Sequence, residues 1–226
     1  MIPWRLLDTA KVPDQGGELR LMQRGDEFSI MAGPTSLMTS KRSGSEETLA
    51  TLVCERLKNS ERPRLLIGGL GMGFTLRAAL AALGTEASIV VAELVPAVVR
   101  WAKGPMAEVF GNSLTDPRVR IEEKDVRKVI GAESSAYDAI LLDVDNGPQG
   151  LTRKANNALY DLEGLHAARA ALRPRGVLAV WSSGPNRDFT QRLRKTGFKV
   201  EEVKARANGA RGGAWHIIWI ATNPAR

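Results

Sequence analysis

The sequence predicts an α/β protein built on one mostly parallel, doubly wound sheet. From residue 63 onward, short and almost wholly apolar segments alternate with segments of helical period. Strands that are apolar throughout are typical of a sheet covered by helices on both faces, and right-handed crossovers then give the doubly wound arrangement. Near the C-terminus, two alternating strands flank a glycine-containing turn, which predicts an antiparallel hairpin at the end of the sheet.

The elements are expected in the following order. Residues 1–45 hold two β-prone pieces separated by Gly25-Asp26, which predicts a small N-terminal β element. Residues 46–226 are expected to form the sheet domain, and its first helix has Ser43 as a candidate N-cap. Parallel strands are expected at 64–67, 87–92, 119–122, 137–142 and 176–181, helices at 74–83, 96–109 and 159–172 and directly after residue 125, and hairpin strands at 198–203 and 215–220.

Composition argues against several functional classes. The net charge of +7 comes from scattered basic residues without interleaved aromatic side chains, which favours a solvated basic face over a nucleic-acid interface. The single cysteine, Cys54, lies in an apolar helical pattern and is expected to be a packed core thiol. No stretch approaches the roughly 18 apolar residues of a membrane span, and the N-terminus lacks the pattern of a secretion signal. We therefore expect a cytoplasmic protein that does not bind membranes.

A glycine-rich turn is the sharpest motif in the chain. Gly68, Gly69, Gly71 and Gly73 directly follow the first apolar strand and open the next helix. Glycine is required where the chain turns with positive φ and where a ligand approaches the backbone. We predict that these four glycines bind a nucleoside, and a tight turn without a ligand is the alternative.

Carboxylates follow the next three strands. Glu93 is placed to accept hydrogen bonds from ribose hydroxyls, Asp125 with the adjacent Val126 to contact adenine, and Asp143 with Asp145 to hold or deprotonate an amine. The alternative for Glu93 and Asp125 is capping of the following helix, and for Asp143 it is hydrogen bonding to its own loop. Because the carboxyl ends of parallel strands meet at one edge, these residues should form one cleft with the glycine turn.

The two histidines have no metal-ligand spacing to a partner, and both His166 and His216 are expected to be structural. The sequence has no histidine–cysteine cluster and no serine nucleophile elbow. We therefore expect neither a metal site nor a hydrolase site.

These residues resemble the spermidine synthase family of aminopropyltransferases, which share the Rossmann-like class I methyltransferase fold. The resemblance runs from about residue 17 to residue 220 and includes residues 25–28, the glycine turn with Thr75-Leu76-Arg77, Glu93, Asp125 and residues 137–143 and 159–160. It implies a mostly parallel seven-stranded sheet with a C-terminal antiparallel hairpin. It also implies a homodimer that uses S-adenosylmethionine or its decarboxylated form as donor and a small amine, such as a polyamine, as acceptor. In such an enzyme, Glu93 would bind ribose, Asp125 would contact adenine and Asp143 would activate the amine.

The chain departs from the family mainly on the side that binds the amine. Leu70 and Met72 stand in the turn where the family carries an aspartate, and residues 143–148 read Asp-Val-Asp-Asn-Gly-Pro in place of Asp-Ser-Ser/Thr-Asp-Pro. Only Ser45-Glu46-Glu47 stands where Tyr-His-Glu is expected. Three functions therefore stay open: aminopropyl transfer, methyl transfer to a small molecule or, less favoured, to nucleic acid, and nucleoside binding without catalysis.

Overall fold

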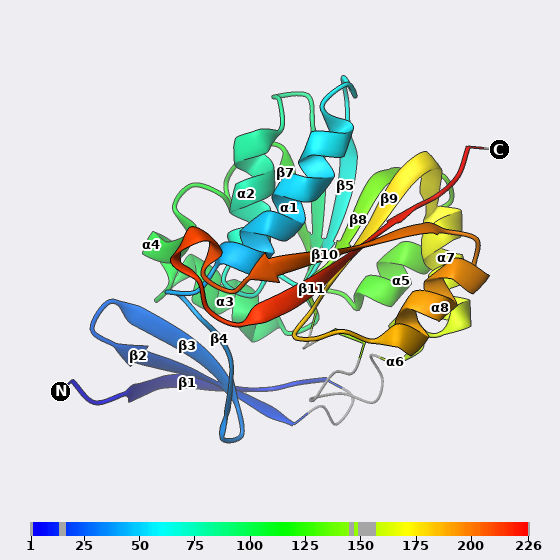
Figure 1. Cartoon of the computed structure of the whole chain (residues 1–226). Helices are drawn as coiled ribbons and strands as arrows, with labels where there is room; N and C mark the ends of the chain where they lie inside the picture. Colours follow the sequence, from blue (N-terminus) through cyan, green and yellow to red (C-terminus); the bar gives the residue numbers. More distant parts are fainter. Residues whose placement is uncertain (1, 14–16, 145–146, 149–156, 226) are drawn as a thin grey trace.

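The computed structural model describes residues 2–13, 17–144, 147–148 and 157–225 and shows two sheets, with helices around the larger one (Figure 1). The smaller sheet is antiparallel in the order β1-β2-β3-β4 and accounts for the expected N-terminal β element. Its strands are β1 (Arg5–Lys11), β2 (Glu18–Arg24), β3 (Glu27–Ala32) and β4 (Thr35–Thr39).

The larger sheet has seven strands in the order β10-β11-β9-β8-β5-β6-β7. The neighbours from β9 to β7 are parallel, whereas β11 is antiparallel to both β9 and β10. The expected mostly parallel sheet with a C-terminal hairpin is therefore confirmed. Its strands are β5 (Arg64–Gly68), β6 (Ser88–Ala92), β7 (Val119–Glu122), β8 (Tyr137–Leu142), β9 (Leu172–Ser182), β10 (Lys199–Arg206) and β11 (Trp215–Thr222).

Helices cover both faces of this sheet, and two hydrophobic cores result. One core joins α1, α2 and α3 to the sheet and includes buried residues of the N-terminal sheet, and it also contains Cys54. The other core joins α5, α7 and α8 to the opposite face. The helices are α1 (Gly44–Leu57), α2 (Phe74–Ala82), α3 (Pro96–Lys103), α4 (Ala107–Phe110), α5 (Val126–Gly131), α6 (Asn157–Tyr160), α7 (Leu162–Ala171) and α8 (Arg187–Lys195).

Several helix boundaries differ from the sequence prediction. The helix expected at 96–109 is divided into α3 and α4 because Gly104 ends α3 and Pro105 follows it. The helix expected at 159–172 is divided at Asp161, whose side chain accepts a hydrogen bond of 2.8 Å from the Gly164 amide and so caps α7. Ser43 occupies the N-cap position of α1, but its side chain makes no capping hydrogen bond.

Helix α8 was not predicted. Its nine residues are mostly charged or polar, and Phe189, Thr190 and Leu193 are the ones it buries against the sheet. The helix begins at Asn186, whose side chain accepts a hydrogen bond of 3.0 Å from the Phe189 amide.

The carboxyl ends of β5, β6 and β8 meet at one edge of the larger sheet. The N-terminal sheet packs beside this edge, because Leu19, Leu21 and Ile30 belong to the same core as α1 and β5 (Figure 1). The boundary expected at residue 45 falls just inside α1, and the two expected domains therefore share a core. Among the described residues, none of the helices has the length and apolar character needed to cross a bilayer.

Candidate active site

The glycine turn connects β5 to α2 in a conformation that requires glycine at several positions. Gly69, Gly71 and Gly73 have φ values of +92°, +51° and +73°. A Cβ atom on Gly69 would lie 2.5 Å from the carbonyl oxygen of Asp143, and one on Gly73 would lie 2.4 Å from the Phe110 ring. The turn therefore packs tightly against the end of β8 and cannot accept a side chain at these two positions.

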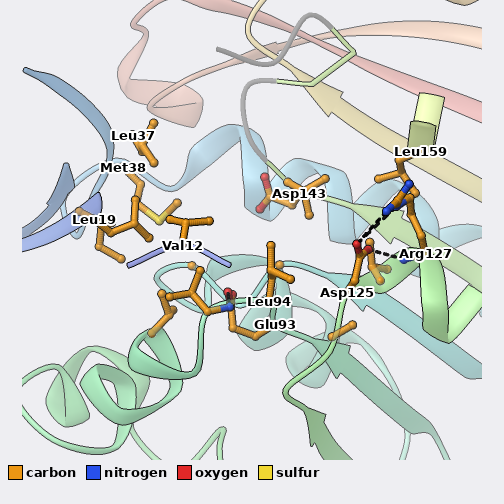
Figure 2. A pocket seen from close by; sticks show the side chains of 18 residues that line it. Val12, Leu19, Leu37, Met38, Glu93, Leu94, Asp125, Arg127, Asp143 and Leu159 are labelled. Atoms are coloured by element: carbon orange, nitrogen blue, oxygen red, sulfur yellow. Dashed lines mark hydrogen bonds and ion pairs between the residues drawn. The ribbon is translucent and has the colours of Figure 1, made fainter. Parts of the chain in front are cut away.

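A cavity of about 140 Å³ lies between the glycine turn, the ends of β6 and β8, the start of α5 and the N-terminal sheet (Figure 2). It contains most of the site residues expected from the sequence: Gly69, Gly71, Glu93, Asp125, Val126 and Asp143. Gly68 and Gly73 do not line it, and their nucleoside contact stays a prediction. Asp145 lies outside the described residues.

Side chains of the N-terminal sheet form an apolar wall of the cavity, which was not expected from the sequence. Leu19 and Ile30 come from β2 and β3, and Leu37 and Met38 come from β4. Val12, just beyond β1, completes this wall. The alternating patterns of these strands predict a buried face, but no pattern in the sequence indicates what that face covers.

Glu93 follows β6 and is buried, with an exposed fraction of 7%. Its Oε2 accepts a hydrogen bond of 2.9 Å from the Leu70 amide, and its Oε1 accepts one of 2.8 Å from the Val95 amide. Burial raises the pKa of Glu93, while these backbone amides act to lower it. The bond to Val95 satisfies the amide of the N-cap residue of α3, and the bond to Leu70 ties the glycine turn to β6. Each carboxylate oxygen has a second lone pair, and ribose binding by Glu93 stays a prediction.

Replacement of Glu93 by alanine should weaken nucleoside binding by about 1–3 kcal/mol, the scale for losing a charged hydrogen-bond acceptor. Isothermal titration calorimetry with a folded variant measures this loss. Glu122→Ala is the matched control, because Glu122 ends the neighbouring strand β7 and pairs with Arg120 and Lys124 away from the cavity. Wild-type affinity in the Glu93 variant would remove this residue from the site.

Asp125 caps α5 in this structure. Its Oδ1 accepts a hydrogen bond of 2.9 Å from the Arg127 amide, and its Oδ2 forms an ion pair of 3.2 Å with the Arg127 guanidinium (Figure 2). The capping alternative is therefore realised, while Asp125, Val126 and Arg127 together line the cavity. Contact with adenine stays a prediction for Asp125.

Asp143 follows β8, and its side chain accepts a hydrogen bond of 2.9 Å from Thr75 Oγ1 in the first turn of α2. The alternative for Asp143, hydrogen bonding to its own loop, concerns residues 145–156, most of which lie outside the described residues. Burial raises the pKa of Asp143 to about 6. Burial, together with the charge of Asp143, raises the pKa of Glu46 in α1 to about 7. The ionisation of Glu46 is therefore coupled to that of Asp143, because the charge of one carboxylate disfavours the charge of the other.

The coupling of Glu46 to Asp143 was not expected from the sequence. Glu46 stands in Ser45-Glu46-Glu47, which we read only as the place of a missing signature. Glu46 comes close to Thr75 because α1 packs against α2, and its carbonyl oxygen lies 3.5 Å from Thr75 Oγ1. Acidic residues in a first helical turn are common, since they complement the helix dipole, and the sequence gives no stronger signal.

Trp181 lies beside Asp143 on the neighbouring strand. It follows Val180 in β9, which pairs with Leu142, the residue before Asp143. Its exposed fraction is 8%, and its indole nitrogen has no hydrogen-bond partner among the described residues. An unpaired buried N–H group is costly, but Trp181 is not among the residues that line the cavity.

The charges that line the cavity are mostly negative. Among the described residues, Glu93, Asp125 and Asp143 face a single cation, Arg127, and that cation pairs with Asp125. The described residues contain no group of three or more acidic, histidine or cysteine side chains that could hold a metal ion. The negative charges of the lining favour a positively charged ligand.

No protein-family model matches the chain. It is 34% identical over 147 residues to a polyamine aminopropyltransferase of Korarchaeum cryptofilum, an alignment that covers 63% of this chain and 43% of that protein. The curated homologues of this chain are polyamine aminopropyltransferases. The chain spans less than half the length of the first of these aminopropyltransferases.

Solved structures show the same fold. The spermidine synthase of Thermotoga maritima aligns with a TM-score of 0.76 at 17% identity, covering 98% of this chain and 74% of that one. A spermidine synthase in complex with the transition-state analogue AdoDATO aligns with a TM-score of 0.75 at 17% identity, covering 98% and 73%. The CurJ carbon methyltransferase aligns with a TM-score of 0.57 at 15% identity, covering 80% and 54%. The expected fold, which aminopropyltransferases share with methyltransferases, is confirmed.

Proposed function

We propose that this protein transfers an aminopropyl group from decarboxylated S-adenosylmethionine to a small amine. The observation that carries the proposal is Asp143 at the end of β8, which lines one cavity with the glycine turn, Glu93 and Asp125 and is electrostatically coupled to Glu46 in α1. A carboxyl pair attracts an ammonium group and can accept its proton. The aminopropyltransferase homologues support the same chemistry.

The proposed reaction needs alignment of two substrates and the removal of one proton. The glycine turn lets the nucleoside approach the backbone, Glu93 binds its ribose, and Asp125 contacts its adenine. The amine nitrogen attacks the propyl carbon next to the sulfonium, and the carbon–sulfur bond breaks with its electrons moving to sulfur. A neutral thioether leaves, and Asp143 takes the proton that the amine nitrogen loses.

The charges of the cavity favour the decarboxylated donor over S-adenosylmethionine. The decarboxylated donor carries a sulfonium and an ammonium group, and both are attracted by the carboxylates of the lining. S-Adenosylmethionine adds a carboxylate, and Arg127, the cation among the described lining residues, is already paired with Asp125. The same carboxylates would repel that group.

Calorimetric titration should therefore give a lower Kd for decarboxylated S-adenosylmethionine, by at least roughly 10-fold, or about 1.4 kcal/mol. Methylthioadenosine, which lacks both charged groups, serves as the reference for binding of the nucleoside alone. Incubation with the decarboxylated donor and a diamine should release methylthioadenosine. Tighter binding of S-adenosylmethionine would instead favour methyl transfer, and donor binding without product would favour a non-catalytic homologue.

The polyamine acceptor, the homodimer and the cytoplasmic location are also part of this proposal. The name of the homologues supports a polyamine as acceptor. The homodimer and the location rest on the sequence and stay predictions.

A further inference from the structure

A hydrogen-bonded chain connects the last strand to the acidic pair of the candidate active site. His216 Nδ1 lies 2.9 Å from Ser45 Oγ, although the two residues are 171 positions apart in the sequence. Ser45 Oγ in turn lies 2.6 Å from Glu46 Oε2. Figure 1 shows why this is possible, because β11 passes the N-terminal end of α1. The sequence predicts a structural role for His216, and this contact with Ser45 was not expected from it.

The packing around His216 holds its ring in place. The ring meets Trp181 edge to face, with centroids 4.7 Å apart and an interplanar angle of 75°. Ser45 is fully buried, whereas His216 is half-buried and partly open to solvent. Glu46 is also partly exposed, and the chain therefore connects two partly exposed groups through the buried hydroxyl of Ser45.

Few charged groups face the imidazole. From α1 the nearest is Glu46, which it reaches through Ser45, and Glu47 beside it is exposed. On β10 the residue opposite His216 is Ala205, while Arg206 is opposite Trp215 and lies over that indole, 3.7 Å from its centroid. From β9 it meets the uncharged Trp181. Burial lowers the pKa of His216, which keeps the ring neutral at pH 7.

The single hydroxyl proton of Ser45 couples the protonation state of Glu46 to that of His216. When Glu46 is ionised, Ser45 donates to it, and His216 must then donate from Nδ1 to Ser45. When Glu46 is protonated, it donates to Ser45, and Ser45 then donates to Nδ1 of a ring protonated at Nε2. Both arrangements use the same heavy-atom positions, and one proton can therefore pass from Glu46 to a ring that starts in its Nε2–H form.

We propose that Glu46, Ser45 and His216 form a relay that carries the proton lost by the acceptor amine from the acidic pair toward solvent. The inference rests on the proposed function, which releases one proton per transfer. The amine N–H bond breaks and its proton passes to the carboxyl pair. Glu46 gives a proton to Ser45 as Ser45 gives its own to Nδ1 of His216, and Nε2 then releases a proton to water. This returns Glu46 to its ionised form and leaves His216 in its Nδ1–H form, and before the next transfer the ring regains its Nε2–H form by turning and exchanging protons with water.

The first experiment needs no substrate, so it is separate from any test of the transferase activity. Nitrogen-15 NMR of the histidine rings should show His216 protonated at Nδ1 at pH 8, where Glu46 is ionised, instead of the Nε2–H form usual for free histidine. Ser45→Ala should return the ring to the Nε2–H form and make it insensitive to Glu46→Gln. An Nε2–H ring in the wild-type protein at pH 8 would overturn the relay.

The second experiment separates proton transfer from positioning. Asparagine at position 216 can still donate a hydrogen bond to Ser45 but cannot carry a proton. His216→Asn should leave the donor Kd unchanged and lower turnover at least roughly 10-fold, and added imidazole should restore part of the loss. His166→Asn is the matched control and should be fully active, because His166 is exposed on α7.

The two experiments distinguish failure of the relay from failure of the proposed transferase activity. Loss of turnover without rescue by imidazole, in a variant that binds donor normally, would leave His216 a purely structural role. If the wild-type protein shows no transfer to any amine, the proposed function fails, and the tautomer measurement alone decides whether the relay exists.

Discussion

Asp143→Asn should lower the turnover of aminopropyl transfer at least about 100-fold, the low end for general acid–base catalysis. The substitution keeps the shape of the side chain and can keep the hydrogen bond to Thr75, but it removes the charge that attracts the ammonium group. The nucleoside is held by other residues, and the Kd for methylthioadenosine, which lacks both charged groups of the donor, should therefore remain nearly unchanged. Steady-state kinetics and calorimetry on the same preparation measure the two effects separately.

The pH dependence of turnover provides a second test of the role of Asp143. Burial raises the pKa of Asp143 to about 6, and Glu46 titrates near 7, which makes the working carboxylate form scarce below these values. Turnover in the wild-type protein should rise as pH increases through this range, and the rise assigned to Asp143 should be missing in the variant. Asp188→Asn, an exposed aspartate in α8, is the control. Wild-type turnover in Asp143→Asn would exclude a catalytic role.

Gly69→Ala should destabilise the fold by about 2–4 kcal/mol and abolish measurable nucleoside binding. The backbone at this position has a φ of +92°, which costs a non-glycine residue about 1–2 kcal/mol. The added methyl group would also lie 2.5 Å from the carbonyl oxygen of Asp143, and overpacking of this kind costs about 1–3 kcal/mol. The turn can relieve this contact only by moving away from β8, which would displace the Asp143 backbone.

Urea denaturation measures the stability of the Gly69 variant. Gly84→Ala is the matched control, because a Cβ atom at Gly84 would meet nothing within 4 Å. The control should stay within about 0.5 kcal/mol of the wild-type protein. A Gly69 variant as stable as this control, and still able to bind donor, would show that the turn tolerates a side chain and would contradict the conformational argument.

The central sheet could be predicted because its strands carry a strong local signal. Residues 137–142 and 176–181 are apolar along their length, which is typical of strands covered on both faces. Helix α8 lacked such a signal, because its burial rests on two large apolar side chains among charged neighbours. The break between α3 and α4 was signalled by Gly104-Pro105, and we overlooked it.

The candidate site was predictable where it follows from sheet topology. Glu93, Asp125 and Asp143 each follow a parallel strand, and sheet geometry brings such positions to one edge. Glu46 and His216 could not be found in this way, because their contact depends on how α1 packs against the C-terminal hairpin. The apolar wall of the cavity depends in the same way on the docking of the N-terminal sheet.

Because the N-terminal sheet supplies this wall, ligand binding in the cavity depends on the packing of the first 39 residues against the rest of the chain. The N-terminal sheet shares its core with α1, and the described part of residues 1–39 contains no helix to cover it. A ligand that contacts Leu19 and Met38 on one side and the glycine turn on the other is bound only while the two parts stay together. Such a ligand binds the closed arrangement of the two parts and not the open one. By mass action, its binding free energy therefore stabilises the contact between the small sheet and the rest of the chain, and it shifts the local opening equilibrium of the small sheet toward the closed state.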